Sequence, residues 1–300
     1  MTVFQKLTAF FMSLIAWLTA LFTGAARIDR MSYIYRDLSY GPHERQIVDI
    51  YVPKSAEGDT GVILLIHGGA WISGDKSAYQ DQLRYWSQQG YVAAALNYRY
   101  VSEDGFHVND ELDDITAALT AVKTACAEHS VNASGVLLTG HSAGGHLSLL
   151  YAYARASESP IPPVAVVDRC GPVDLSQRNF IEINNKESEN EMCALFSACC
   201  GVTVTPENFD SQASQTALRA VSPAAYITGN TVPTLICHGV QDELVPYSQA
   251  LELDAALTEN GVHHDLVTFP NSGHGLGSDP QSSSTEQTLF LQYASAYLQK

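Results

Sequence analysis

The residues best placed to do chemistry surround Ser142. An apolar run at 136–139 breaks into the small-residue turn GHSAGG at 140–145 and then into a helical pattern. A serine hydroxyl is a poor nucleophile at neutral pH, so it needs exposure, a base within hydrogen-bond reach and donors for the oxyanion. A sharp corner gives the exposure, and Gly140 and Gly144 would let the two backbones approach closely. We therefore expect Ser142 to be the nucleophile, with the N–H of Ala143 as one oxyanion donor.

A second motif, HGGAW at 67–71, directly follows an apolar run. A glycine pair at this place lets successive N–H groups point into a cleft and form the other half of an oxyanion hole. We assign these donors to Gly69 and Ala70, and we expect Trp71 to contact substrate. A tight strand-to-helix turn would explain the glycines but not the bulky Trp71.

The remaining catalytic groups are expected at the ends of two later strands. Asp242 lies in an acidic turn after the buried strand at 234–237, with Glu243 as a reserve, and it would orient a histidine. His274 follows the strand at 265–269, and its flanking glycines would let it swing toward Ser142. Along the chain the three groups occur in the order serine, acid, histidine.

Three further histidines are expected to be structural. His146 lies one turn after Ser142 on the same helix face, has no carboxylate motif behind it, and would support the elbow. His67 and His238 end buried strands, and we expect them to hydrogen-bond loop backbone.

Alternating strands and helices must position these motifs. Period-two alternation or continuous apolar runs predict strands, and the 3.6-residue period predicts helices. The strands are expected at 46–52, 62–66, 91–96, 136–139, 164–167, 234–237 and 265–269, with a polar hairpin connection at 54–60. The helices are expected at 77–88, 113–123, 147–154, 248–260 and about 285–298. This alternation predicts an α/β fold, a doubly wound, mostly parallel sheet with helices on both faces.

One long segment interrupts the alternation. Residues 172–221, which we call the insertion, are polar at 177–191 and rich in cysteine and phenylalanine at 192–200. Loops of this length inside a domain are usually lids or binding loops, so we expect a cap over the site. The predicted organisation is a hydrophobic N-terminal segment at 1–30 and an α/β-hydrolase domain at 31–300 that contains this cap.

The four motifs together resemble the α/β-hydrolase fold and, within it, the esterase branch with an HGGxW oxyanion motif. That branch includes feruloyl- and acetyl-esterase-like proteins, kynurenine-formamidase-like enzymes and relatives of the hormone-sensitive-lipase group. The resemblance runs from about residue 45 to the C-terminus, and the insertion has no matching motif. It implies a carboxylesterase-type serine hydrolase that acts through an acyl-enzyme, without a metal or other cofactor. Substrate choice does not follow from the resemblance, because the insertion has no matching motif; we favour esters of short acyl groups over insoluble fat.

Several alternatives stay open. The same machinery would serve an arylformamidase of the N-formylkynurenine type, or an acetylxylan or feruloyl esterase acting on plant polysaccharide. A peptidase and a non-catalytic binding protein are the further rivals. The expected partner is therefore a small-molecule ester or an ester-substituted carbohydrate.

Composition bears on partners and location. A net charge of −16 and a pI of about 4.8 argue against nucleic acid as a partner. Residues 7–22 are uncharged and apolar, which fits an export signal or a membrane anchor, although Arg27, Arg30 and Arg36 put more positive charge after them than before. A helix packed on the domain is the alternative and would leave a cytoplasmic location open; an apolar N-terminal helix would also suit a homodimer.

The cysteines are expected to be free buried thiols, because six cysteines do not make a disulfide framework in a chain of 300 residues. A local disulfide or a soft-metal site at Cys193, Cys199 and Cys200 is the alternative.

Overall fold

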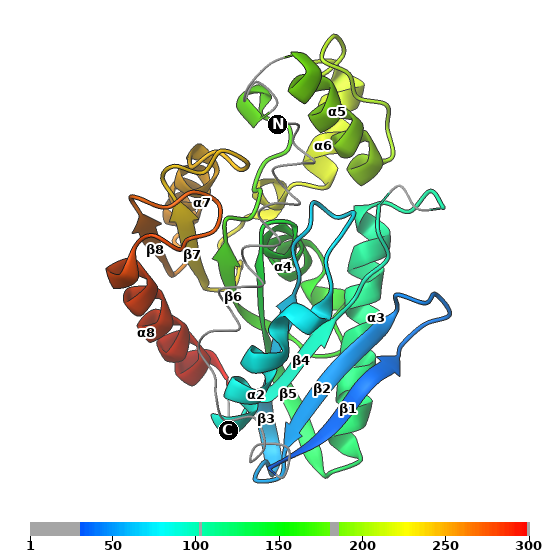
Figure 1. The fold of residues 1–300 in the computed structure, drawn as a ribbon, viewed down its shortest axis with the longest axis vertical. Helices are drawn as coiled ribbons and strands as arrows, with labels where there is room; N and C mark the ends of the chain where they lie inside the picture. The colour runs from blue at the N-terminus through cyan, green and yellow to red at the C-terminus, as the bar shows by residue number, and fades with distance from the viewer. Residues whose placement is uncertain (1–30, 102–103, 181–185, 299–300) are drawn as a thin grey trace.

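The computed structural model describes residues 31–101, 104–180 and 186–298. Within them the chain forms an eight-stranded sheet of order β1-β2-β4-β3-β5-β6-β7-β8 (Figure 1). The strands are β1 (Ser32–Ser39), β2 (Ile47–Pro53), β3 (Gly58–Ile66), β4 (Val92–Leu96), β5 (Val131–His141), β6 (Pro163–Arg169), β7 (Thr234–Gly239) and β8 (His264–Phe269). β2 is antiparallel to both β1 and β4, and the pairs from β4 to β8 are parallel.

The helices follow the strands along the chain. The α-helices are α2 (Gln80–Gln88), α3 (Val108–Ala127), α4 (Ala143–Ala154), α5 (Lys186–Cys200), α6 (Gln212–Ala220), α7 (Ser248–Glu259) and α8 (Pro280–Tyr297). Short 3₁₀ turns are η2 (Lys76–Tyr79), η3 (Ala156–Glu158), η4 (Arg178–Phe180) and η5 (Pro223–Tyr226).

Two apolar cores lie on opposite faces of the sheet. Side chains alternate along a strand, so Val62, Leu64 and Ile66 of β3 enter one core. Ile63 and Leu65 enter the other. Buried residues of α3, α4 and α7 complete the first core, and those of α2 and α8 complete the second. The predicted doubly wound, mostly parallel sheet with helices on both faces is confirmed.

The sheet differs from the sequence prediction at its N-terminal edge. β1 was not predicted, because its register shifts between Tyr35 and Leu38 and Asp37 there has a φ of 50°, which breaks the alternation. The predicted hairpin at 54–60 is wrong. β3 begins at Gly58, and β4 lies between β2 and β3, so the connection crosses over to a non-adjacent position.

The insertion contains helices that the sequence pattern does not predict. α5 and α6 lie together at one end of the molecule, apart from the sheet (Figure 1). In α5, Met192, Phe196 and Cys199 are buried at helical spacing. Ser211 caps α6 by accepting the N–H of Ser214. All six cysteines are free thiols in the structure.

The predicted membrane or export segment at 7–22 lies outside the described residues. Among the helices that are described, none has the length and apolar character that a bilayer-spanning helix needs.

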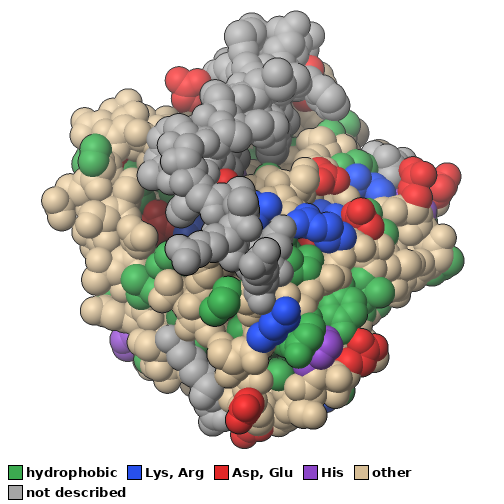
Figure 2. Space-filling model, turned by 60° about the horizontal axis from the view of Figure 1, so that its bottom comes forward, with side chains coloured by type: hydrophobic (Ala, Val, Ile, Leu, Met, Phe, Trp, Pro, Cys, Tyr) green, Lys and Arg blue, Asp and Glu red, His purple; other side chains and the backbone are tan. Residues whose placement is uncertain are grey.

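On the face seen in Figure 2, the described basic side chains lie beside acidic and apolar ones and form no continuous basic patch.

A buried ion cluster fixes the segment that follows the HGGAW motif. Nζ of Lys76 lies 2.6 Å from Oδ1 of Asp49 on β2 and 2.6 Å from Oδ1 of Asp37 on β1. Only 6% of the Lys76 side chain and 3% of that of Asp49 are exposed. The cluster therefore joins η2 to the antiparallel edge of the sheet.

We predict that Lys76→Ala lowers the free energy of unfolding by about 3–5 kcal/mol, because the buried Asp49 carboxylate loses its counter-charge. Urea unfolding at pH 7 measures the change. Arg84→Ala is the control, since the Arg84–Asp81 pair is a partly exposed i,i+3 pair, and it should cost less than about 1 kcal/mol. Equal losses in the two variants would contradict the prediction.

Candidate active site

Ser142 occupies a strained corner between β5 and α4. Its φ of 59° lies in the left-handed region, which is unfavourable for a residue with a side chain. Its N–H donates to the carbonyl of Arg169 on β6 at 2.8 Å, and its carbonyl accepts the N–H of His146 at 3.0 Å. These bonds hold the corner on the sheet side and on the helix side.

The two glycines that flank Ser142, Gly140 and Gly144, are required for a steric reason. A Cβ on Gly144 would lie 2.0 Å from the carbonyl oxygen of Ile66, and one on Gly140 would lie 2.3 Å from the carbonyl carbon of Gly144. Neither position can hold a side chain. The end of β3 and the first turn of α4 are therefore in backbone contact beside Ser142.

Asp242 and His274 form a direct pair. Nδ1 of His274 lies 2.7 Å from Oδ2 of Asp242, and the other carboxylate oxygen accepts the N–H groups of Leu244 and Val245 at 2.8 and 2.9 Å. Burial alone would raise the pKa of Asp242, but His274 and the hydrogen bonds from His274 and His238 hold it well below its usual range. Asp242 is therefore ionised and oriented.

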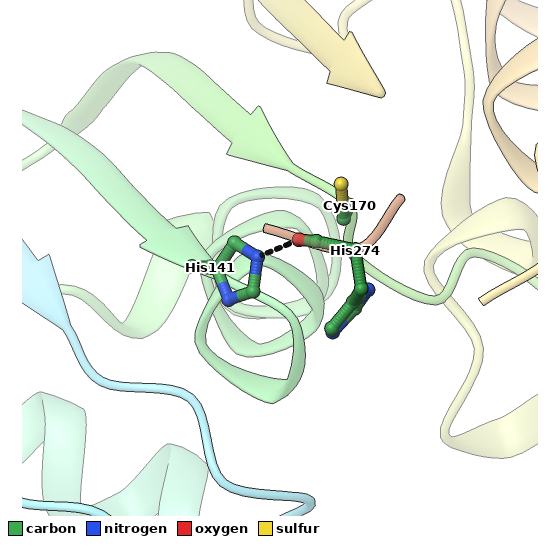
Figure 3. Close-up of side chains that lie close together, drawn as sticks. All are labelled: His141, Cys170 and His274. Carbon is green, nitrogen blue, oxygen red and sulfur yellow. Dashed lines mark hydrogen bonds between the residues drawn. The ribbon is translucent and has the colours of Figure 1, made fainter. Parts of the chain in front are cut away.

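His141 joins the elbow to the loop of His274. Its Nε2 lies 2.7 Å from the carbonyl oxygen of His274, and since a carbonyl only accepts, Nε2 must carry the proton (Figure 3). The centroids of the His141 and His274 rings lie 4.7 Å apart. Burial, followed by the neighbouring His274, lowers the pKa of His141 to about 3, so this imidazole is neutral at physiological pH.

Cys170 lies next to His274 in the close-up of the site (Figure 3). Ligand atoms of His141, Cys170 and His274 fall within 4.8 Å of one another, which raises the question of a metal. However, Nε2 of His141 is bonded to a carbonyl and Nδ1 of His274 to Asp242, and burial raises the pKa of the Cys170 thiol well above its usual value. A cysteine binds a metal as the thiolate, which this burial disfavours, so we assign no metal to this cluster.

The HGGAW loop has an unusual backbone. Gly69, Ala70 and Trp71 have φ values of 130°, 52° and 61°, and a Cβ on Gly69 would lie 2.0 Å from the carbonyl oxygen of Ser73. A Cβ on Gly68 would lie 3.3 Å from Cβ of Ser142, so the loop passes directly beside the elbow. Successive residues in such conformations can turn several N–H groups toward one anion.

Trp71 is anchored by the protein. It is 3% exposed, and its indole N–H donates to Nδ1 of His146 at 3.1 Å. Nε2 of His146 in turn donates to the carbonyl of Val221, the last residue of the insertion, at 2.8 Å. These contacts give Trp71 a structural role and offer no support for the substrate contact expected of it. They agree with the supporting role expected of His146.

A polar network holds the far side of the same loop. The hydroxyl of Tyr98 donates to the carbonyl of His67 at 2.8 Å, and that of Tyr100 donates to Gly74 at 2.6 Å. The side-chain amide of Asn97 donates to Asp75 at 2.6 Å and its oxygen accepts the N–H of Lys76 at 2.7 Å. Residues that follow β4 therefore hold the loop in place, as α4 does from the other side.

His238 lies beside Asp242 and Asp168 lies near His238, and neither residue is assigned to the site from the sequence. His238, expected only to bond loop backbone, does lie 3.0 Å from the carbonyl of Val245, but its Nε2 is also 3.3 Å from Oδ2 of Asp242. Asp168 is 1% exposed and accepts the N–H of Gly171 at 3.0 Å. The only sequence signal was the position of both residues at or near the ends of adjacent parallel strands.

This architecture defines the class. A mostly parallel doubly wound sheet, with a serine at positive φ between a strand and a helix and an Asp–His pair on later loops, is the α/β-hydrolase fold. The chain belongs to the BD-FAE family, whose model matches residues 48–257.

The chain is similar to proteins from a bacterium, a plant and gut microbiota. The chain is 24% identical over 249 residues to esterase LipQ of Mycobacterium tuberculosis, covering 80% of this chain and 56% of that protein. It is 28% identical over 246 residues to acylamino-acid-releasing enzyme 1 of Oryza sativa subsp. japonica, covering 78% of this chain and 29% of that protein. It thus spans about half of the first relative's length and about a third of the second's. A truncated carbohydrate esterase from gut microbiota has the same fold, with a TM-score of 0.71 at 22% identity, covering 91% of this chain and 100% of that one.

Buried neutral histidines make the site sensitive to acid. Burial lowers the pKa of both His67 and His146 to about 4, whereas an unfolded histidine titrates near 6.5. Between these values the unfolded chain binds more protons than the folded one, so each imidazole makes stability fall as the pH falls. Asp168, whose pKa is raised by burial to about 7, acts in the opposite sense.

We predict that between pH 7 and pH 5 the wild type loses about 2 kcal/mol of unfolding free energy relative to His146→Gln, because Gln cannot take up the proton. Urea unfolding at both pH values measures the difference. His263→Gln removes an exposed imidazole and should follow the wild type. Parallel pH dependence in wild type and His146→Gln would refute the prediction.

Proposed function

We propose that this protein is a serine hydrolase that cleaves carboxylic esters of short acyl groups through an acyl-enzyme. One arrangement carries the proposal: the ionised Asp242 bonded to His274, whose loop is bonded through His141 to the elbow that presents Ser142. The esterase LipQ and the carbohydrate esterase resembled by this chain support the same reaction class.

The residues divide the reaction as follows. Ser142 Oγ attacks the ester carbonyl while His274 accepts its proton, and Asp242 stabilises the imidazolium that results. The imidazolium then protonates the leaving alcohol, and water repeats the sequence to release the acid. The N–H groups of Gly69, Ala70 and Ala143 are the proposed donors to the oxyanion, and each such donor is typically worth about 2.7–4 kcal/mol of barrier.

Neutral His141 suits this sequence. Its ring lies 4.7 Å from that of His274, so a charged His141 would oppose the imidazolium on His274 by a few kcal/mol at an effective dielectric constant of about 20. Because burial keeps His141 neutral, it can hold the His274 loop in place without opposing the charge that His274 must carry.

We predict that Ser142→Ala lowers kcat for p-nitrophenyl acetate by at least about a thousandfold and abolishes the acylation burst, because no other group replaces the nucleophile. Ser148→Ala is the matched control on the same helix, where the hydroxyl only donates to the carbonyl of Gly144. It should keep activity within a few-fold of wild type. Retained turnover in folded Ser142→Ala would contradict the assignment.

The alcohol and acyl parts of the substrate distinguish the candidate reactions. The proposed alternative is an arylformamidase of the N-formylkynurenine type, or an acetylxylan or feruloyl esterase. The resemblance to a carbohydrate esterase favours polysaccharide esters within this set. An N-acetylated amino-acid amide belongs in the comparison because of the similarity to acylamino-acid-releasing enzyme 1.

We predict the highest kcat/KM for acyl chains of two to four carbons in a p-nitrophenyl series from acetyl to palmitoyl. Methyl ferulate, acetylated xylan, N-formylkynurenine and an N-acetylalanine amide are assayed beside it, with Ser142→Ala as blank. Dominant turnover of the formyl amide would move the same triad to the formamidase. A maximum at long chains would contradict the short-acyl proposal.

Membrane contact through residues 7–22 and a homodimer remain proposals that rest on the apolar sequence of that segment. Flotation with lipid vesicles and light scattering of the full chain test them, and a monomer that stays below the vesicles would reject both.

A further inference from the structure

Asp242 lies between two imidazoles. Its Oδ1 accepts two backbone N–H groups, from Leu244 and Val245. Its Oδ2 alone faces the histidines, with Nδ1 of His274 at 2.7 Å and Nε2 of His238 at 3.3 Å. The mechanism proposed above uses only the first of these two contacts.

His238 can present only one edge to Asp242. It is 0% exposed, and its Nε2 also lies 3.0 Å from the carbonyl oxygen of Val245. A carbonyl oxygen cannot donate, so Nε2 must carry a proton. That single N–H bonds to Val245, and Nε2 also lies 3.3 Å from the carboxylate oxygen to which His274 is bonded.

The other groups around His238 come from β6, from the residues just after β6 and from the residue before α7. Asp168 and Cys170 face it from β6 and the residues just after it, and the ring of Tyr247, beside the start of α7, lies 5.9 Å away. Among the described residues, neither Nδ1 of His238 nor Oδ2 of Asp168 has a hydrogen-bond partner. Burial opposes a charge on His238, but the bond to Asp242 and the charges of Asp242 and Asp168 raise its pKa.

We propose that His238 is a positioning residue of the active site: its Nε2–H bonds to Oδ2 of Asp242 and keeps that oxygen aimed at His274. The proposal rests on the triad assigned above. His238 would not touch substrate. It would act through the carboxylate, as hydrogen-bonded groups behind a catalytic or metal-binding side chain commonly do.

Loss of this N–H should have two effects. The carboxylate stays attached through Oδ1, but Oδ2 is freer to turn, so the orientation of His274 suffers and kcat falls. At the same time Oδ2 becomes a stronger acceptor for His274, which favours the imidazolium. The acid limb of the kcat/KM profile should therefore move to higher pH, which a general loss of folded protein would not cause.

The test compares His238→Leu with His238→Gln in the full chain. The Leu variant should lose roughly tenfold in kcat with little change in KM, and its acid limb should rise by about half a pH unit. Gln offers an amide N–H where Nε2–H was and should restore most of kcat. His264→Leu is the matched control, because His264 also lies 3.3 Å from an aspartate, Asp254, but outside the site. It should behave as wild type.

A second readout does not depend on ester turnover. The proton between His274 and Asp242 should give a low-field NMR resonance in the ¹⁵N-histidine-labelled protein, and it should move downfield in His238→Leu. An unmoved resonance and an unmoved acid limb in a folded Leu variant overturn the proposal. If Leu does not fold, His238→Asn removes the same N–H and is judged by the same two readouts. A shifted resonance in a protein that hydrolyses no ester would uphold the positioning role while rejecting the esterase function.

Discussion

The site depends on a close backbone contact between the end of β3 and the start of α4. The carbonyl of Ile66 lies where a Cβ of Gly144 would be, and a Cβ of Gly140 would lie 2.5 Å from the same oxygen. Only glycine permits this approach. Because the HGGAW loop leaves β3 at Ile66 and Ser142, the proposed nucleophile, lies between the two glycines, one steric constraint brings the proposed oxyanion donors and Ser142 to the same edge of the sheet.

Hydrogen bonds position the other groups of the site around that contact, and in each bond the donor and the acceptor are fixed. Neutral His141 donates to the backbone of His274, and ionised Asp242 receives the side chain of the same residue. Neutral His146 accepts from Trp71 and donates to Val221. Burial keeps His141 and His146 neutral, whereas the histidine partners of Asp242 keep it ionised against the effect of burial.

The parallel centre of the sheet and the main motifs could be predicted from the sequence because each is a local pattern. A strand buried on both faces is a continuous apolar run, and Ser142, Asp242 and His274 each follow such a run in a turn rich in glycine or polar residues. The antiparallel edge of the sheet was harder to predict from the sequence. The register shift and Asp37 interrupt β1, and strand direction in the pair of β2 and β4 leaves no mark on either sequence. The roles of His238, Asp168 and Trp71 depend on which way each side chain turns between neighbouring strands and helices, and that is decided by contacts far apart in the chain.

The bond from His146 to the carbonyl of Val221 has a consequence for divergence within the family. It joins the end of the insertion to the HGGAW loop through a main-chain atom, which every amino acid supplies. The side chains of the insertion can therefore change without loss of the anchor that holds Trp71. Substitutions in the insertion would leave the HGGAW loop and its proposed oxyanion donors in place.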